Sequence, residues 1–242
     1  MPKANLAVSI IAKNAAKTIG ACLDSIVPYV REVVVCVDAK TTDQTAKHAK
    51  RHGARVFTGL KVSEWHECEC HGKVLAQHFA RARQEAFSRL PKDVDWYMWI
   101  DADDIVKGGE KLAEFLPKLA PEVAVVWLPY HYSQAGKDGP TSTLFDRERI
   151  VRANMPWQWL HRVHEILAPV GCATEQLNWM RTDDVAVYHQ GEGHDTQGSA
   201  RRNILLLEID LEEDPNDTRA LFYLGNQYFA LGEWATAVEY YE

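Results

Sequence analysis

The segment that most constrains the fold is a short apolar run that ends in a cluster of carboxylates. Trp96–Ile100 is almost wholly apolar and rich in residues that favour strands, which predicts a strand buried on both faces. Asp101, Asp103 and Asp104 follow it directly. Like charges this close oppose one another's ionisation, and a divalent cation such as Mg2+ or Mn2+ removes that penalty. The alternative interpretation is a polar turn, because aspartate is also common in turns.

Strand-like and helix-like segments alternate along the chain. The expected strands are residues 6–12, 32–37, 55–58, 96–100 and 122–132, and the expected helices are residues 15–26, 42–52, 73–90 and 195–212, with an irregular stretch at 59–72. This alternation predicts right-handed βαβ units and an α/β fold with a mostly parallel sheet flanked by helices. Ligands bind outside the carboxyl ends of the strands in such a sheet, so the aspartates after residue 100 mark the expected site.

The composition is that of an ordinary globular protein and excludes several classes. The 242 residues are 46% hydrophobic and 25% charged, and the net charge of −7 offers no basic field for nucleic acid or an acidic membrane. No apolar run is long enough to span a membrane, and we expect no signal peptide. The five cysteines are an odd number and mostly scattered, which does not indicate a disulfide framework. We therefore expect a cytoplasmic protein.

The composition changes near residue 214, and the segment that follows has the spacing of a tetratricopeptide helix pair. The residues at the characteristic positions are Leu224, Gly225, Tyr228, Leu231, Gly232, Trp234, Ala237 and Tyr241. We accordingly divide the chain into a domain of residues 1–213 and a helix pair of residues 214–242. Two helices do not bury a repeat core alone, so we expect the pair either to belong to a longer repeat protein or to cap the first domain.

Taken in order, several motifs resemble the GT-A glycosyltransferases of the large inverting family two. They are SIIAKNAAKTIGACLDSI, VVVCVDAKTTDQTAKHAKRHGARVF, ARARQEAF, DADD, LHRVHEIL and VYH. The last two resemble motifs of a branch that often carries C-terminal tetratricopeptide repeats, and the match covers most of residues 5–215. The resemblance implies a Rossmann-like GT-A fold and metal-dependent, inverting transfer of a sugar from a nucleotide-sugar, most simply a UDP-sugar.

The resemblance also implies which residues contact the nucleotide. Asp38, at the end of the second strand, would accept a hydrogen bond from a uracil N–H or a ribose hydroxyl. Lys13 and Asn14 leave the first strand at the same edge and would contact base or phosphate, with a polar turn as the alternative. Arg83 would contact the diphosphate or the base, and its alternative is a surface arginine.

In the same resemblance, the carboxylates after residue 100 hold the metal. Asp101 would contact the ribose or a metal-bound water, and Asp103 would ligate the Mn2+ or Mg2+ that bridges the diphosphate. His189 would be a further ligand, and imidazole suits Mn2+ better than Mg2+. Asp104 is expected on the solvent side or behind the ligands.

Glu165 is the candidate general base on the acceptor side. An inverting transfer needs one carboxylate to take the acceptor proton as the acceptor attacks the anomeric carbon. The alternative is that Glu165 pairs with Arg162 or His164. Trp157 and Trp159, just upstream, could stack on a sugar face or belong to the core.

Some features leave alternatives open. The histidines and cysteines of residues 66–71 could bind zinc, but their spacing is tighter than usual, and an acceptor loop over the active site is the preferred interpretation. Other functions are a non-catalytic scaffold that binds a peptide or glycan, and a nucleotidyltransferase, although the glycine-rich phosphate loop expected of the latter is missing. The acceptor could be a glycan, a lipid-linked glycan, a protein or a modified nucleic acid, and the helix pair could hold a protein partner.

Overall fold

The computed structural model describes residues 2–68, 71–134, 141–190 and 196–242, and the chain divides into two compact units. We call them the sheet unit (Met1–Leu60, Arg83–Gln158 and Leu167–Gly191) and the helical unit (Lys61–Ala82, Trp159–Ile166 and Glu192–Glu242). Within the described residues, the chain passes between them after Leu60 and within α3 (Phe79–Ser88), β10 (Trp157–Leu160) and β11 (Ile166–Pro169). Each unit is described by itself below.

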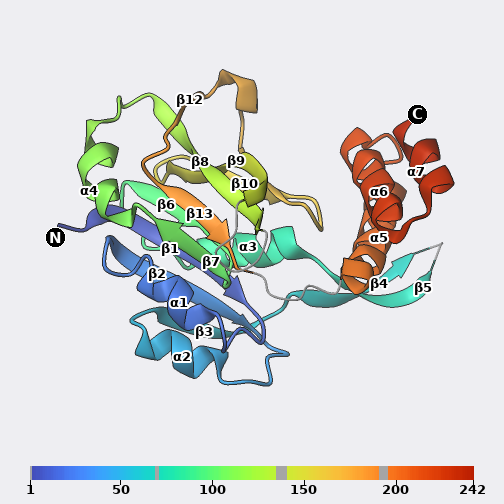
Figure 1. The fold of residues 1–242 in the computed structure, drawn as a ribbon, viewed down its shortest axis with the longest axis horizontal. Helices are drawn as coiled ribbons and strands as arrows, with labels where there is room; N and C mark the ends of the chain where they lie inside the picture. Colours follow the sequence, from blue (N-terminus) through green and yellow to red (C-terminus); the bar gives the residue numbers. More distant parts are fainter. Residues whose placement is uncertain (1, 69–70, 135–140, 191–195) are drawn as a thin grey trace. The chain divides into compact units, whose positions relative to one another are not determined.

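A nine-stranded sheet forms the sheet unit, in the order β3-β2-β1-β6-β9-β8-β13-β7 with β12 beside β8 (Figure 1). The strands are β1 (Ala4–Ala12), β2 (Val30–Asp38), β3 (Arg55–Leu60), β6 (Trp96–Trp99), β7 (Asp104–Lys107), β8 (Val123–Gln134), β9 (Thr141–Arg152), β12 (Asn178–Arg181) and β13 (Ala186–His189). Most pairings are parallel, while β9 is antiparallel to β6 and β8, and β7 is antiparallel to β13. The predicted α/β class with a mostly parallel sheet is confirmed.

The strand directions bring several carboxyl ends to one edge of the sheet. β1, β2, β3 and β6 run parallel, and β8 runs with them because β9 is antiparallel to both β6 and β8. β13 is parallel to β8, so its end lies at the same edge. β7 and β9 run the other way and therefore begin there. This edge is where an α/β sheet binds its ligands.

Helices cover both faces of β6. One face contributes Trp96 and Met98 to a core shared with α1 (Ile19–Asp24), α2 (Thr45–Arg51), α4 (Leu112–Phe115) and η2 (Leu116–Lys118). The short helix η1 (Gly109–Lys111) precedes α4. On the other face the Tyr97 ring contacts Phe87 of α3 edge-on, with ring centroids 5.9 Å apart. All four residues of β6 are buried, which confirms the predicted strand buried on both faces.

The structure corrects the expectation for residues 59–90. In place of an irregular stretch and a helix from residue 73, β4 (Ser63–Cys68) and β5 (Gly72–Gln77) form an antiparallel hairpin, and α3 begins only at Phe79. Residues 73–77 contain good helix formers, but cross-strand pairing outweighs that weak local preference. Ala76 and Cys68 become buried in the core of the helical unit as a result.

In the described part of the helical unit, the hairpin is followed by α5 (Thr196–Glu213), α6 (Thr218–Leu231) and α7 (Trp234–Tyr241), side by side in Figure 1. The side chain of Asp217 caps α6 by accepting from the Arg219 and Ala220 amides at 2.9 and 3.1 Å. A Cβ at Gly225 would lie 2.3 Å from Cε1 of Tyr241, so α6 and α7 pack closely because this position is glycine. Within the described residues, no helix has the length and apolarity needed to cross a membrane.

The boundaries of the two compact units differ from the predicted division at residue 214. α5 lies before that boundary, yet its Leu206 and Leu207 share a core with Ala220 and Leu224 of α6. The apolar face of α5 therefore packs against the C-terminal helices. The division into residues 1–213 and 214–242 stays a prediction.

Candidate active site

The ends of β1 and β2 bring Lys13 close to Asp38. Asp38 is buried, and Lys13 Nζ lies 3.8 Å from its Oδ2. The Oδ1 atom accepts a hydrogen bond from the Lys40 amide at 3.0 Å, whereas no described residue donates a hydrogen bond to Oδ2. A buried acceptor without a donor is uncommon, because it loses its hydrogen bonds to water. Oδ2 of Asp38 is therefore suited to receive an N–H or O–H group from a ligand.

Asn14 has a structural role at this edge. Its φ of 48° is in the left-handed region that asparagine tolerates better than most residues. Its Oδ1 accepts from the Thr42 amide at 2.9 Å, and Oγ1 of Thr45 accepts from the Ala15 amide at 2.7 Å. These bonds tie the turn after β1 to the turn after β2. A contact between Asn14 and a nucleotide stays a prediction.

Arg83 and Asp101 form an ion pair beside the end of β6. Nη2 of Arg83 donates to Oδ1 of Asp101 at 2.6 Å, and the guanidinium lies 4.8 Å from the centre of the Trp99 ring. Burial alone would raise the pKa of Asp101, but the guanidiniums of Arg83 and Arg149 outweigh it and hold that pKa well below its usual value. Because Arg83 is buried, the alternative of a surface arginine is wrong.

Asp104 is fully buried, so of its two expected positions the solvent side is wrong and the position behind the ligands stays a prediction. Tyr130 donates its hydroxyl proton to Oδ1 at 3.2 Å, and the Asp101 amide donates to Oδ2 at 3.0 Å. The guanidinium of Arg149, also fully buried, has Nη2 at 3.4 Å from Oδ2 and lies between the Trp99 and Tyr130 rings, at 3.9 and 4.3 Å from their centres. These groups fix the position of the Asp104 carboxylate.

Neither Tyr130 nor Arg149 was identified as a site residue from the sequence. Residues 146–149 read Asp-Arg-Glu-Arg, a charged run that favours an exposed strand. The available signal was the apolar end of the same strand: Ile150 and Val151 are buried, and a charged residue beside them needs a partner when the strand is central.

Asp103, Asp104 and His189 form a group whose ligand atoms all lie within 4.8 Å of one another. β13 pairs with β7 so that His189 is opposite Asp104, although 85 residues separate them in the chain. Nδ1 of His189 lies 3.6 Å from Oδ1 of Asp103 and 3.3 Å from Oδ1 of Asp104. Adjacent ligands about 2.1 Å from an octahedral ion are about 3 Å apart, so this donor set fits Mg2+ or Mn2+. Asp101 is not part of the group, and its role as a ligand stays a prediction.

The pKa values in this group show the electrostatic strain that a cation would relieve. Burial raises the pKa of Asp103, the charge of His189 opposes that rise, and the carboxylates of Asp101 and Asp104 add to it, so the pKa is raised overall. Burial lowers the pKa of His189, but its hydrogen bond to Asp104 and the charges of Asp103, Asp104 and Asp101 together raise it overall. The carboxylates thus favour a positive charge at this point, supplied either by a proton on His189 or by a metal ion.

Glu165 lies in the helical unit, where neighbouring residues anchor its segment to α5 and α6. Nη1 of Arg162 donates to Oδ1 of Asp210 at 2.6 Å and to Oε2 of Glu213 at 2.8 Å, and Nη2 donates to Oε1 of Glu213 at 2.6 Å. Arg219 donates to the His164 carbonyl at 2.7 Å. Glu165 itself is half-buried. The anchored segment holds this carboxylate in place, and its role as a base stays a prediction.

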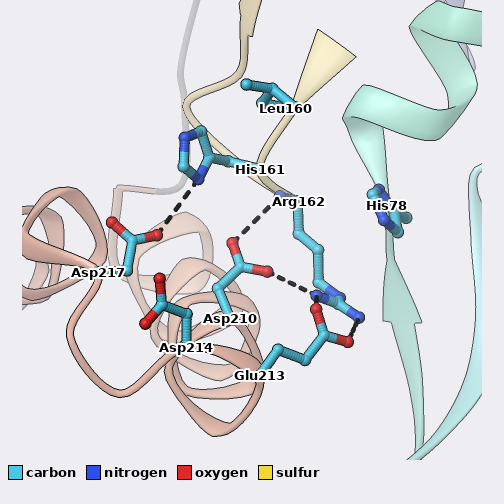
Figure 2. A pocket seen from close by; sticks show the side chains of 8 residues that line it. All are labelled: His78, Leu160, His161, Arg162, Asp210, Glu213, Asp214 and Asp217. Carbon is cyan, nitrogen blue, oxygen red and sulfur yellow. Dashed lines mark hydrogen bonds and ion pairs between the residues drawn. The ribbon is translucent and has the colours of Figure 1, made fainter. Parts of the chain in front are cut away.

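A cavity of about 300 Å3 lies within the same unit, lined by His78, Leu160, His161, Arg162, Asp210, Glu213, Asp214 and Asp217. Figure 2 shows the Arg162 side chain reaching the carboxylates of Asp210 and Glu213. Nδ1 of His161 lies 3.4 Å from Oδ2 of Asp217. These contacts pair three of the four acidic side chains that line the cavity. The cavity wall therefore belongs to the contacts that anchor the Glu165 segment to α5 and α6.

Two other predicted features have different outcomes. Trp157 and Trp159 are 8% and 6% exposed, so they belong to the core and the stacking interpretation is wrong. The zinc hypothesis for residues 66–71 includes Cys70, which lies outside the described residues. Nε2 of His71 lies 2.7 Å from Oε2 of Glu208.

Comparison with known proteins identifies the class. Residues 7–166 match the Glycosyl transferase family 2 model, which is more than half of the chain, and the chain therefore belongs to this family. The predicted assignment to the glycosyltransferases is confirmed.

The curated relatives that match are also glycosyltransferases. The SPbeta prophage-derived glycosyltransferase SunS of Bacillus subtilis (strain 168) is 26% identical over 239 residues, which is 96% of this chain and 51% of the relative. Glycosyltransferase SunS of Bacillus phage SPbeta matches with the same values. The chain spans about half the length of these relatives.

Solved structures show weaker similarity. A mycobacterial protein is 15% identical, with a TM-score of 0.49 over 86% of this chain and 74% of that one. Mycobacterium tuberculosis glucosyl-3-phosphoglycerate synthase, in complex with Mg2+ and UDP, is 16% identical, with a TM-score of 0.45 over 86% of this chain and 78% of that one. Likenesses at this level carry no functional information.

Proposed function

We propose that this chain forms the catalytic part of a metal-dependent, inverting GT-A glycosyltransferase that uses a UDP-sugar. The family match supports sugar transfer over a scaffold or a nucleotidyltransferase. The observation that carries the proposal is the arrangement of Asp103, Asp104 and His189 around one point at the sheet edge. That edge also carries Asp38, whose buried Oδ2 accepts no hydrogen bond from the described part of the chain.

Each residue at this edge would have a separate role in binding the donor and the metal. Asp103 and His189 would hold a divalent cation, with Asp104 as a third ligand or as the group that orients His189. When bound, the cation stabilises the negative charge that develops on the departing nucleoside diphosphate. Asp38 would accept a hydrogen bond from uracil or ribose. Arg83 would add positive charge near the diphosphate while it holds Asp101.

Glu165 would take the proton from the acceptor as that nucleophile attacks the anomeric carbon. One carboxylate base acting on the side opposite the leaving group gives inversion at that carbon. We also propose that α6 and α7 are a tetratricopeptide-like pair, which the close approach at Gly225 supports.

Calorimetry tests the metal assignment. UDP should bind in the presence of Mn2+ and lose most of its affinity in EDTA, because the carboxylates repel a diphosphate unless a cation lies between them. Addition of excess Mn2+ after EDTA should restore binding. Equal UDP affinity in Mn2+ and in EDTA would reject the proposed metal dependence.

A further inference from the structure

Three aromatic side chains lie on one face of the β8–β9 pair. Tyr130 and Tyr132 are two residues apart on β8 and therefore point to the same side, and Phe145 of β9 is directly opposite Tyr130. The Phe145 ring centre is 5.4 Å from that of Tyr130 and 6.0 Å from that of Tyr132. We call these three residues the aromatic platform.

The platform is continuous with the candidate metal group. The Tyr132 ring stacks on the imidazole of His189, with centroids 5.4 Å apart and planes inclined by 12°. Tyr130 donates its hydroxyl proton to Oδ1 of Asp104. Two members of the platform therefore touch two members of the metal group, and all of these residues belong to the sheet unit.

The outer part of the platform is open to solvent. Tyr132 is 49% exposed and Phe145 is 39% exposed, whereas Tyr130 is 4% exposed. Exposed aromatic rings beside a polar site are typical of ligand contacts, because burying them against a ligand recovers their hydrophobic free energy. The predicted stacking residues, Trp157 and Trp159, are not accessible for this role.

We propose that Tyr132 and Phe145 form the binding surface for the sugar ring of the donor. This inference rests on the proposed function. A pyranose has a face of C–H groups that packs on aromatic rings and a rim of hydroxyls that stays hydrated. The sugar is bonded to the same diphosphate that the metal group would hold, so it must lie next to that group, as Tyr132 does.

The strand order supports the donor sugar as the occupant. Asp38, the proposed nucleoside contact, ends β2, and the platform lies on β8 and β9, with β6 and its aspartates between them. A UDP-sugar that spans this edge would place its nucleoside over β2, its diphosphate at the end of β6 and its sugar over the platform. The acceptor would lie beyond the sugar, one group further from His189.

The chain provides a matched control for substitutions in the platform. Leu144 is 55% exposed and adjacent to Phe145, so its side chain points to the opposite face of the sheet. It is opposite His131, whose ring stacks on Tyr188 at 3.9 Å on that face. Leu144→Ala removes exposed apolar surface from the same strand without touching the platform.

Calorimetry in Mn2+ with UDP and with a panel of UDP-hexoses and UDP-N-acetylhexosamines tests the inference. The unsubstituted protein should bind at least one UDP-sugar more tightly than UDP. Tyr132→Ala and Phe145→Ala should each weaken that UDP-sugar about tenfold and leave UDP and Mn2+ affinity unchanged. Leu144→Ala, outside the platform, should bind like the unsubstituted protein.

Several outcomes would overturn the inference. Unchanged UDP-sugar affinity in both alanine variants would show that the platform does not hold the donor sugar. The same conclusion would follow if the only change were a higher KM for an acceptor. An equal loss of UDP, UDP-sugar and Mn2+ affinity in Tyr132→Ala would show that Tyr132 acts only through His189. If the unsubstituted protein bound no UDP at all, the proposed function itself would fail, and this inference with it.

Discussion

Each unit of the chain buries an arginine next to carboxylates, and the two arginines differ in how completely they are bonded. Arg162 of the helical unit donates to Asp210 and Glu213 at 2.6–2.8 Å. Arg149 of the sheet unit donates to the Trp99 carbonyl at 3.3 Å, while its Nε and Nη2 make no hydrogen bond to any described residue. Its nearest approach to Asp104 is the ion-pair distance of 3.4 Å.

The difference separates a structural anchor from a site. A buried guanidinium with short, well-directed bonds holds its segment in place and has little capacity left for a ligand. A buried charge with incomplete bonding is destabilising and persists where another group completes it or where function requires it. The carboxylate beside Arg149, that of Asp104, belongs to the group that fits a divalent cation, so incomplete bonding coincides with the candidate metal group.

Removal of one metal ligand should have the largest effect. Asp103→Asn keeps the size of the side chain and removes its charge, so sugar transfer should fall at least about 1,000-fold, since a metal supplies several kcal/mol of transition-state stabilisation. The Mn2+-dependent part of UDP affinity should also disappear. Asp183→Asn is the control, because its side chain is 76% exposed and pairs with Arg181. Near-normal turnover in Asp103→Asn would place the metal elsewhere.

The anchored segment allows a test of the base. Glu165→Gln should lower turnover about 100- to 10,000-fold and leave donor affinity almost unchanged, because a base acts in the transition state. Proton NMR of fresh product from an α-linked donor should show a β-linkage. Loss of donor affinity with turnover preserved at saturation would make Glu165 a binding residue, and a retained α-linkage would reject the inverting mechanism.

A paired substitution tests the comparison of the arginines directly. Arg162→Met leaves the buried carboxylate of Asp210 without its partner and should lower the free energy of unfolding by about 3–5 kcal/mol, with or without Mn2+. Arg149→Met leaves Asp104 without its cationic neighbour, but Mn2+ can replace that charge. Thermal unfolding should therefore show a larger Mn2+-induced rise in Tm for Arg149→Met than for the unsubstituted protein. Equal Mn2+ effects on all three proteins would refute the distinction.

The smallest predicted effect is the pH dependence of the stability that the contact between Arg162 and Glu213 contributes. Hydrogen bonds from Arg162 lower the pKa of Glu213 more than its partial burial raises it. Glu213 therefore contributes stability above its unfolded pKa of about 4.3, and the contribution is lost as pH falls through the lower folded value. Urea unfolding between pH 7 and pH 3 should show a shallower acid loss for Glu213→Gln. The difference should be modest, since the carboxylate is 59% exposed.

Local sequence patterns were sufficient for five strands of the sheet, β1, β2, β3, β6 and β8, and for the polar residues that follow β2 and β6. The apolar runs before Asp38 and Asp101 form buried strands of the sheet, and the polar residues follow them at the expected edge. A buried parallel strand needs apolar residues on both faces, so its signal is contained in a few consecutive residues. The helix pair after residue 214 was readable for a similar reason, since Asp217 and Gly232 mark the ends of α6.

Tertiary structure decided the features that depend on pairing between distant segments. β5 forms where the first part of the helix at residues 73–90 was predicted, because it pairs with β4. Arg149 became a buried charge because β9 lies between β6 and β8. The register that places His189 opposite Asp104 and Phe145 opposite Tyr130 is set by strand pairing across 85 and 15 residues. Sequence thus determined which residues stand at strand ends, whereas the order and register of the strands determined which of them meet, because those contacts form only when the whole sheet is assembled.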